Sequence, residues 1–519
     1  MDQTDRWSKS SAWLLLGLPA FAKVLLHFLT NGNYGYFRDE LYYIACSDHL
    51  AWGYVDHPPL SILILKITRL IFGDSIFAIR LPVVLAGAAS VVLTGLIARE
   101  MGGGRFAQFT AALAYMVMGV SLAMPTFFSM NALDHLFWGL CALIVVRIIR
   151  IENPRLWLVF GLVAGIGMMN KISMGFFGFG IVVGLLLTAQ RKQFGSPWIW
   201  VGGAIAFLIF LPHVLWQSAN GWPTLEFMSN AREHKIVPVL PLQYLMGQVL
   251  DTNPLTVPVW LAGLGYLLFT GKGRPYRFLA IAYLAILLLF IVQKAKGYYL
   301  APAYPMLYGA GAIAIENFIR RPTTDRPRPA WISGLLSTGV LLLLVIGGAI
   351  IAPMAVPILP PESYLRYQKM LGFEPPREEV GHTAELPQHF ADRFGWEAMV
   401  AEVAKVYNSL SPEDRARCEI VCRNYGEAGA IDFFGPRHGL PKAICGHNNY
   451  WLWGPRDATG EVVIALGWLR GEHEELFEQV EQAATIVSPY ALERNVPIHV
   501  CRRVKRPIKD VWPELKGFI

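Results

Sequence analysis

Long apolar stretches, separated by short polar segments, dominate the first two thirds of the chain. An apolar helix needs about 20 residues to cross the hydrocarbon core of a bilayer. Stretches near that length, some of them shorter, lie at 11–30, 76–98, 106–124, 135–150, 156–170, 174–190, 197–216, 254–270, 278–293, 300–316 and 331–352. The pattern predicts about eleven transmembrane helices within a membrane domain at 1–352.

Every second polar connection is rich in lysine and arginine, which predicts the topology. The basic residues of these connections are Arg6, Lys9, Arg99, Arg105, Arg147, Arg150, Arg155, Arg191, Lys192, Lys272, Arg274, Arg277, Arg320, Arg321, Arg326 and Arg328. Positive residues stay on the cytoplasmic side, so we expect a cytoplasmic N-terminus. The first apolar stretch resembles a signal peptide, with "PAFA" as a cleavage site, but the alternation of the following spans favours an uncleaved first span.

The composition changes after residue 352, where a Pro-rich linker at 352–364 precedes a charged tail. Short apolar runs in "CEIVCRN", "KAICG", "VVIALG", "ATIVS" and "IHVCRRV" predict strands, and "GEAGAIDFFG" and 471–483 predict helices. We expect one soluble α/β domain at 353–519. An odd number of spans places it outside the cytoplasm, in the periplasm or cell exterior.

The composition supports a multi-pass membrane protein, since 54% of residues are hydrophobic and 16% are charged. The net charge of +7 comes largely from the cytoplasmic connections, so we expect no nucleic-acid partner. Six cysteines include a C-x3-C pair, Cys418 and Cys422, without a histidine cluster beside it. This spacing favours buried thiols, or a disulfide in an exported domain, over a metal site.

The connection after the first span, "RDELYYIACSDHLAWGYVDHPPL" (38–60), carries unusual chemistry for a loop beside a bilayer. A short helix from residue 39 to about 50 would place Asp39 and Tyr42 on one face and Leu41, Ile44 and Ala45 on a face suited to the membrane surface. A second amphipathic segment, 60–72, would lie in the interface, with Lys66 and Arg69 snorkelling. Asp39-Glu40 and Asp56-His57 are then two acidic sites at headgroup depth, although such loops are often plain connectors.

Further charged groups lie on the same predicted outer side. Asp134 begins the fourth span, and an ionisable residue there is a candidate functional group. Lys294 and Lys296, in "QKAKGYYLAPAYP", oppose the positive-inside bias, although lysines beside Tyr298 also serve as interfacial anchors.

Carboxylates and lysines on one outer membrane surface suit transfer of a sugar from a polyprenyl phosphate. A base must take the proton of the acceptor hydroxyl. Cations must stabilise the negative charge that builds on the departing phosphate.

These motifs resemble the GT-C membrane glycosyltransferases, in the family 39 and aminoarabinose-transferase-like group related to protein O-mannosyltransferases. "RDELYY" resembles the acidic motif of that group, "DHPPL" its acidic-basic-Pro-Pro element, and "KAKGYYLAPAYP" its late lysine-tyrosine-proline motif. His57 stands where relatives often carry lysine. The resemblance covers roughly residues 10–350 and implies a GT-C fold: a membrane all-α domain with interfacial helices in the first outer loop, followed by the soluble α/β domain.

The resemblance also implies roles for single residues. Asp39 would be the catalytic base, with Glu40 and Asp56 orienting acceptor or sugar. The substrate-binding residues would be His57, Asp134, Lys294, Lys296, Tyr298 and Tyr42. No metal ligand or cofactor is expected, although Asp39, Asp56 and Asp134 have the donor atoms for a divalent ion.

The expected partners are a polyprenyl-phosphate sugar donor, an envelope glycan, lipid or protein as acceptor, and the lipids of the cell inner membrane. A transporter or flippase is the alternative of a different class, but the sequence shows no repeat and its charges gather in outer loops. A glycan-binding receptor is a third reading. In the tail, Asn424, Tyr425, Glu427, His447, Asn448 and Tyr450 follow strand ends and either recognise a ligand or serve as turn and capping residues.

Overall fold

The computed structural model describes residues 9–235, 237, 239–320, 329–372, 384–468 and 470–519. Contacts divide the chain into two compact units. Unit 1 comprises residues 1–32, 80–214 and 238–359, and unit 2 comprises residues 33–79, 215–237 and 360–519. The loop between the first two predicted spans therefore belongs to the same unit as the C-terminal tail.

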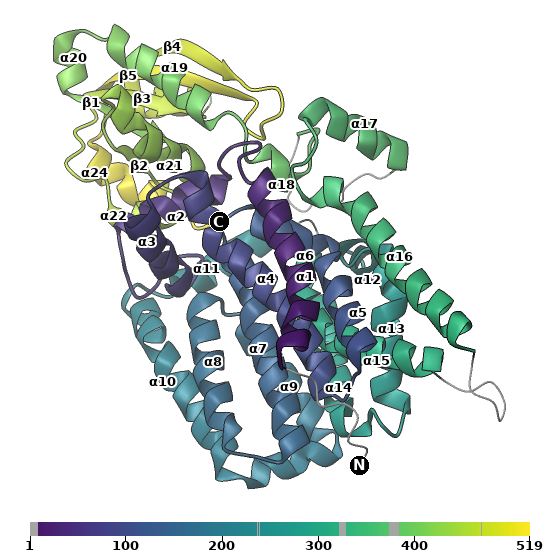
Figure 1. The fold of residues 1–519 in the computed structure, drawn as a ribbon. Coiled ribbons are helices and arrows are strands. Elements are labelled where there is room, and N and C mark those ends of the chain that lie inside the picture. The colour runs from purple at the N-terminus through teal and green to yellow at the C-terminus, as the bar shows by residue number, and fades with distance from the viewer. Residues whose placement is uncertain (1–8, 236, 238, 321–328, 373–383, 469) are drawn as a thin grey trace. The chain divides into compact units, whose positions relative to one another are not determined.

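Unit 1 is a bundle of apolar helices (Figure 1). They are α1 (Lys9–Thr30), α4 (Ile76–Glu100), α5 (Arg105–Met116), α6 (Gly119–Ala123), η2 (Met124–Thr126), α7 (Met130–Ile151), α8 (Leu156–Asn170), α9 (Met174–Leu186), η3 (Ala189–Gly195), α10 (Pro197–Ala219), α12 (Pro241–Asp251), η5 (Pro254–Thr256), α13 (Val257–Phe269), η6 (Arg274–Tyr276), α14 (Arg277–Gln293), η7 (Gly297–Ala303), α15 (Tyr304–Arg320) and α16 (Ala330–Ala355). The first residues of α4 and the last of α10 extend into unit 2.

A helix lies in each predicted apolar stretch, but fewer helices meet the length of a membrane span. Among the described residues, five helices are long and apolar enough to cross a membrane, and seven are if each of two bent pairs counts as one span. The bent pairs are 105–126, with a bend of 66°, and 174–195, with a bend of 110°. The structure thus supports a multi-pass membrane protein, and the number of eleven spans stays a prediction.

Glycines let the backbones of α13 and α15 approach closely. A Cβ atom added to Gly311 would overlap the backbone oxygen of Val259, and one added to Gly263 would overlap that of Leu307. Small residues at such crossings are typical of helix pairs packed within membranes.

We expect Gly311→Ala to lower the thermal unfolding temperature of the detergent-solubilised protein. The added methyl group must push α13 and α15 apart, which costs about 1–3 kcal/mol for overpacking. Gly265→Ala is the matched control, because a Cβ at Gly265 meets nothing within 4 Å. Equal unfolding temperatures for the two variants would contradict the close packing.

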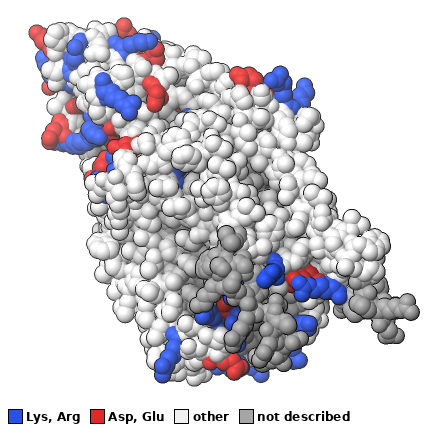
Figure 2. Space-filling view, in the orientation of Figure 1, with Lys and Arg blue, Asp and Glu red and all other residues white. Residues whose placement is uncertain are grey.

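The predicted cytoplasmic connections of unit 1 gather at one end of the bundle. Arg150 forms an ion pair with Glu100 at 3.1 Å, and the N–H of Gly104 donates to Glu316 at 2.7 Å. Further hydrogen bonds join Trp157 to Gln193 and Gln190 to the oxygen of Pro275. On the face drawn in Figure 2, the body of unit 1 is almost free of coloured residues, and Lys and Arg residues appear toward its lower end. This clustering of basic connections is the geometry that the alternation of spans requires.

Unit 2 combines short helices with one mixed sheet. The helices are α2 (Arg38–Asp48), α3 (Leu60–Phe72), α11 (Pro223–Asn230), η4 (Ala231–Lys235), α17 (Pro361–Leu371), α18 (Gln388–Ala391), α19 (Trp396–Ser409), α20 (Pro412–Ala416), α21 (Tyr425–Phe434), η8 (Gly435–His438), α22 (Asn449–Trp453), α23 (Arg470–Leu476), α24 (Ile508–Val511) and η9 (Trp512–Leu515). The strands are β1 (Cys418–Cys422), β2 (Ala443–Cys445), β3 (Val462–Leu466), β4 (Phe477–Val487) and β5 (Asn495–Val504).

The five strands lie in the order β2-β1-β3-β5-β4, with β2, β1 and β3 parallel and β5 antiparallel to both of its neighbours. All five predicted strands are therefore present. The predicted helix at 471–483 is wrong beyond Leu476, because Phe477 to Val487 pair with β5 instead. The segment 217–253, between two of the predicted apolar stretches, contains α11, η4 and α12.

The first outer loop folds as the sequence predicts, but one of its faces is covered by protein. Leu41, Ile44 and Ala45 of α2, predicted to lie on the membrane surface, are buried. α2 packs on α21, and a Cβ at Gly429 of α21 would press on Leu41. The membrane-surface prediction for this face of α2 is wrong because the tail supplies an apolar partner.

Helix α3 keeps the expected amphipathic character. Its Ile62 and Leu65 are buried, and Leu70, Ile71 and Phe72 are exposed. Lys66 and Arg69 both form ion pairs with Asp48, and their snorkelling stays a prediction. The prediction of an interfacial helix requires an exposed apolar face of this kind on α3.

The six cysteines are buried and carry free thiols. Cys422 and Cys445 stand opposite each other on the paired strands β1 and β2. Of the two alternatives left open by the sequence, the structure has the buried thiols.

Candidate functional site

Asp39 lies in the first turn of α2 and is held by the tail. Its Oδ1 accepts a hydrogen bond from the Tyr425 hydroxyl at 2.9 Å and lies 3.7 Å from Nε of Arg38. The Arg38 guanidinium lies over the Tyr425 ring, 5.6 Å from its centroid, and 3.4 Å from Asp392. The Asp39 side chain remains 33% exposed, and within the described residues no hydrogen bond reaches its Oδ2. This arrangement fixes a carboxylate while leaving one oxygen accessible.

Asp56 is the second carboxylate of the same unit. Its Oδ1 lies 3.0 Å from the Tyr42 hydroxyl, which also lies 3.1 Å from Oδ1 of Asn449 in the tail. Burial raises the pKa of Asp56 above its ordinary value, opposed by the neighbouring His57 and by the hydrogen bond from Tyr42. The charge of Asp39 raises the pKa of Asp56 further.

Two stacked tyrosines connect these carboxylates. The rings of Tyr42 and Tyr425 lie 4.6 Å apart with planes inclined by 30°. Tyr42 binds Asp56 and Tyr425 binds Asp39. We call these four residues the carboxylate–tyrosine cluster.

His57 is enclosed rather than exposed. Its ring lies 4.6 Å from that of Tyr43 and 4.8 Å from that of Tyr54, measured between centroids. Nδ1 lies 3.0 Å from the Pro58 oxygen, and Nε2 lies 3.8 Å from Oδ1 of Asp56. These contacts orient the imidazole toward Asp56.

Glu40 is fully buried and closes the start of its own helix. Its Oε2 accepts the backbone N–H of Phe37 at 2.8 Å, a local contact that satisfies a donor at the helix N-terminus. The structure thus gives Glu40 a capping role, and its predicted catalytic role stays a prediction.

The tail residues chosen from strand ends divide into two kinds. Asn424 caps α21 by accepting N–H groups of Gly426 and Glu427, and Glu427 accepts the N–H groups of Arg423 and Asn424 in return. Burial raises the pKa of Glu427 to about 8. These two residues are capping groups, as the structural alternative predicted.

His447 supports Tyr425 instead. Its ring lies 4.5 Å from the Tyr425 ring, and Nδ1 accepts the Tyr425 N–H at 3.4 Å. Burial lowers the pKa of His447 to about 3, which leaves the imidazole neutral, and Nε2 lies 2.7 Å from the oxygen of Ile519. Tyr450 donates to Asp432 at 3.0 Å, and Asn448 accepts the N–H of Ile519 at 3.2 Å.

In unit 1, the predicted outer residue Asp134 lies beside Lys171. Asp134 is 2% exposed, accepts the Ser173 hydroxyl at 2.7 Å and lies 3.8 Å from Nζ of Lys171. Lys171 also donates to Asn131 at 2.8 Å and lies 4.7 Å from the centroid of the Tyr299 ring. This buried pair joins the start of α7 to the turn between α8 and α9.

Three further predicted residues lie in or beside η7. Lys294 follows α14 in the left-handed backbone region, with φ of 52°, and its side chain is exposed. Lys296 precedes η7 and is partly buried. The Tyr298 ring packs edge-on against that of Tyr299 at 4.8 Å, and Nζ of Lys171 lies 5.9 Å from its centroid. Tyr298 thus shares the surroundings of Asp134 and Lys171.

Several polar residues of these clusters were not selected from the sequence. Lys171 stands in a short turn between α8 and α9, yet it is buried beside Asp134. Asn449 was not considered, although its Oδ1 accepts the N–H of Val55 at 2.7 Å. Lys23 of α1 is buried and donates to the Ser121 hydroxyl at 2.8 Å. In the sequence, a single charge within an apolar stretch could have indicated this residue as a candidate. Within the described ranges, no group of three or more His, Cys, Asp and Glu side chains could hold a metal ion.

The sequence is similar to proteins that act on lipid-linked sugars. Residues 56–216 match the family model "Dolichyl-phosphate-mannose-protein mannosyltransferase". A relative from Proteus mirabilis, "undecaprenyl phosphate-alpha-4-amino-4-deoxy-L-arabinose arabinosyl transferase 2", is 31% identical over 176 residues, which are 31% of this chain and 30% of the relative. The chain spans less than half the length of the curated relatives that it matches.

Solved structures extend the likeness to nearly the whole chain. ArnT from Cupriavidus metallidurans bound to undecaprenyl phosphate aligns with a TM-score of 0.59 and 12% identity, covering 94% of this chain and 98% of ArnT. The chain has the fold of the ArnT-like GT-C glycosyltransferases. The Archaeoglobus fulgidus oligosaccharyltransferase aligns more weakly, with a TM-score of 0.51 and 12% identity over 84% of this chain and 64% of that one.

The GT-C fold predicted from the first-loop and late lysine motifs is therefore confirmed. The matched family segment contains Asp56, His57 and Asp134. Asp39 and the two lysines of the late motif lie outside that segment, so their roles stay predictions.

Proposed function

We propose that this protein transfers a sugar from a polyprenyl-phosphate donor to an acceptor hydroxyl on the outer face of the inner membrane. The observation that carries the proposal is the Asp39 carboxylate, which is fixed at one oxygen by Tyr425 and Arg38 and is partly exposed. A general base needs this combination, because it must be positioned and must still reach the acceptor proton.

The relatives support the donor class. The Proteus relative is named for an undecaprenyl-phosphate sugar, and the matched family for a dolichyl-phosphate sugar. The donor of this protein would likewise carry its sugar on a polyprenyl phosphate, with arabinose-type and mannose-type sugars as the first to test. An envelope glycan, lipid or protein would be the acceptor.

We assign the steps of the reaction to residues of each unit. Asp39 takes the proton of the acceptor hydroxyl as the oxygen attacks the anomeric carbon. Asp56, held by Tyr42, orients a sugar or acceptor hydroxyl. Lys294 and Lys296 stabilise the phosphate that leaves with the polyprenyl chain, since ammonium groups bind phosphate as point charges.

We expect the full-length protein in nanodiscs to release polyprenyl phosphate and form a labelled product from a labelled polyprenyl-phosphate sugar and an envelope extract. EDTA is expected to leave the rate unchanged, because the proposed mechanism uses lysines rather than a divalent ion. The released polyprenyl phosphate and the labelled product are both measured by thin-layer chromatography. Movement of intact donor between leaflets without any product would replace the proposal with the flippase alternative, and loss of product with EDTA would overturn the metal-independent mechanism.

A further inference from the structure

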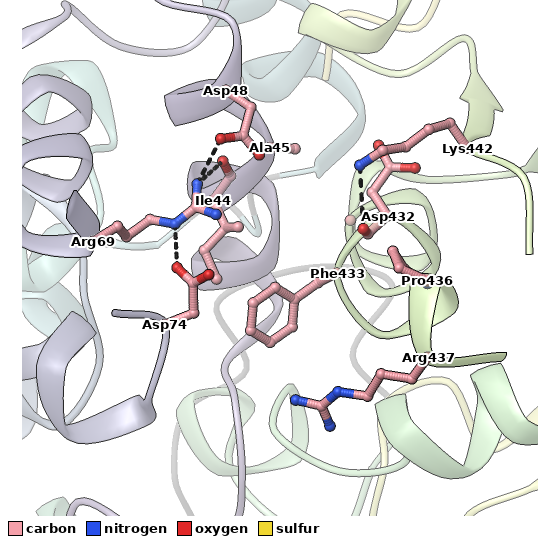
Figure 3. A pocket seen from close by; sticks show the side chains of 11 residues that line it. Ile44, Ala45, Asp48, Arg69, Asp74, Asp432, Phe433, Pro436, Arg437 and Lys442 are labelled. Atoms are coloured by element: carbon pink, nitrogen blue, oxygen red, sulfur yellow. Dashed lines mark hydrogen bonds and ion pairs between the residues drawn. The ribbon is translucent and has the colours of Figure 1, made fainter. Parts of the chain in front are cut away.

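A cavity of about 320 Å³ lies within unit 2, apart from the carboxylate–tyrosine cluster (Figure 3). One wall comes from α2, α3 and the turn after α3, and the other from α21, η8 and Lys442, which precedes β2. The lining residues are Ile44, Ala45, Asp48, Arg69, Asp74, Gly429, Asp432, Phe433, Pro436, Arg437 and Lys442. None of the roles proposed above uses this cavity.

The charges of the loop wall neutralise one another. Nε of Arg69 lies 2.5 Å from Asp74, and Nη1 lies 2.9 Å from Asp48. Arg69 also donates to the backbone oxygen of Ile44 at 3.1 Å. Figure 3 shows its guanidinium held between the two carboxylates. This wall therefore carries little unpaired positive charge.

The carboxylate of the tail wall is likewise engaged within the protein. Asp432 accepts the N–H of Ala443 at 2.8 Å and the Tyr450 hydroxyl at 3.0 Å. Lys442 donates to the backbone oxygen of Asp432 at 3.2 Å, not to its carboxylate.

Two cations of the tail wall lack a carboxylate partner. The Arg437 guanidinium lies over the Phe434 ring at 5.7 Å and is exposed. Among the described residues, neither Arg437 nor Lys442 has a carboxylate oxygen within ion-pair distance. Phe433, drawn between the two walls in Figure 3, adds an aromatic face. Within the described residues, the cavity thus offers two cations without a direct ion pair beside an apolar ring.

We propose that this cavity binds an anionic saccharide, a sugar unit that carries a phosphate or a carboxylate. Arg437 and Lys442 hold the acid group, the guanidinium by its planar pair of donors and the ammonium as a point charge. The sugar ring packs on Phe433, and the carboxylates of Asp48 and Asp74 accept hydrogen bonds from its hydroxyl groups. The volume is at the low end of small-molecule sites, about 300–1,000 Å³, and so fits a single sugar unit rather than an extended chain.

A saccharide held here would be part of the acceptor, an assignment that rests on the proposed function. The binding itself does not, because none of the residues that would contact the saccharide belongs to the carboxylate–tyrosine cluster. Binding and transfer can therefore fail independently.

The test is ligand-observed saturation-transfer NMR on the full chain in detergent. The probes are glucose 1-phosphate and glucuronate, with methyl glucoside and inorganic phosphate as competitors. We expect both acidic sugars to bind, the neutral sugar not to bind, and inorganic phosphate to compete only weakly. Arg437→Ala and Lys442→Ala are each expected to weaken binding about 10-fold, the loss of one charge-assisted contact. The matched control, Arg417→Ala, removes an exposed arginine paired with Glu461 elsewhere in the unit.

Tighter binding of glucose 1-phosphate would indicate a phosphorylated sugar as the ligand, and tighter binding of glucuronate would indicate a uronic acid. Binding that survives both cavity variants, or equal binding of methyl glucoside, would overturn the site. Inorganic phosphate that competes as well as glucose 1-phosphate would overturn the saccharide and leave a plain anion site. Asp39→Asn should bind the probes normally even though its transfer is lost. If the unmodified protein binds the probes but transfers no sugar, the result counts against the proposed function alone.

Discussion

Asp39→Asn should lower the rate of sugar transfer about 10²–10⁴-fold, the usual contribution of a general base. Asparagine keeps the shape of the side chain, and its amide oxygen can still accept the Tyr425 hydroxyl that holds Asp39. The variant loses only the ability to take a proton. Donor affinity and the thermal unfolding temperature should therefore stay unchanged.

The measurement compares kcat and KM for the donor with the unfolding temperature of the same preparations. Asp457→Asn is the control, because Asp457 is an exposed carboxylate of the same unit. Tyr425→Phe separates positioning from proton transfer. It removes the hydroxyl that fixes Asp39 and keeps a ring to stack on Tyr42, so a smaller loss in kcat and a shifted pH profile are expected. Full activity of Asp39→Asn would remove Asp39 as the base and with it the central claim of the proposed mechanism.

The apolar stretches and the strands of the tail could be predicted because each is a local signal. A membrane helix needs a run of apolar residues. The buried strand β3, Val462–Leu466, is a continuous apolar run, so its burial can be read without knowing its neighbours. The number of membrane spans was harder to predict, because bends such as the 66° break within 105–126 depend on packing.

The error at 471–483 has a definite physical origin. Leu476, Phe477 and Val480 have helical spacing in the sequence, but Phe477 and Val480 pair with residues of β5. Phe477 stands opposite Val504 and Val480 opposite Cys501. Cross-strand pairing overrode the local helical pattern.

The candidate site could be predicted from the sequence only in part, for a related reason. Acidic residues in an outer loop are conspicuous, so Asp39 and Asp56 could be chosen from the sequence. The tyrosine partner of Asp39 could not be identified, because Tyr425 is 386 positions from Asp39 and the contact depends on α2 packing against α21. The same packing explains why the apolar face of α2 does not need a membrane.

Lys171→Met should destabilise unit 1 strongly. The substitution removes the ammonium 3.8 Å from Asp134 and leaves a carboxylate that is 2% exposed and accepts a hydrogen bond from the Ser173 hydroxyl. Removing one partner of a buried ion pair costs about 3–5 kcal/mol. A clear fall in the thermal unfolding temperature and in the yield of monodisperse protein is expected.

The double variant Lys171→Met/Asp134→Asn distinguishes a structural pair from substrate-binding groups. It removes both charges, so much of the lost stability should return because no buried charge is left uncompensated. Transfer measured on the stabilised double variant then reports on chemistry alone. A near-normal rate would make the pair a structural tie between α7 and the turn before α9, and a lost rate with restored stability would support the predicted role of Asp134 at the substrate.

Lys294→Met supplies the matched comparison at the same end of unit 1. Lys294 is exposed and follows the end of α14, so its loss should leave the unfolding temperature unchanged. If Lys294 contacts the lipid phosphate, KM for the donor should rise several-fold in the variant. A tenfold rise corresponds to the loss of about 1.4 kcal/mol of binding free energy. An unchanged KM with Lys294→Met and with Lys296→Met would remove the lysines from the phosphate site. Because the two lysines and Lys171 differ in burial, a single set of stability and kinetic measurements separates the cation that stabilises the fold from those that serve the donor.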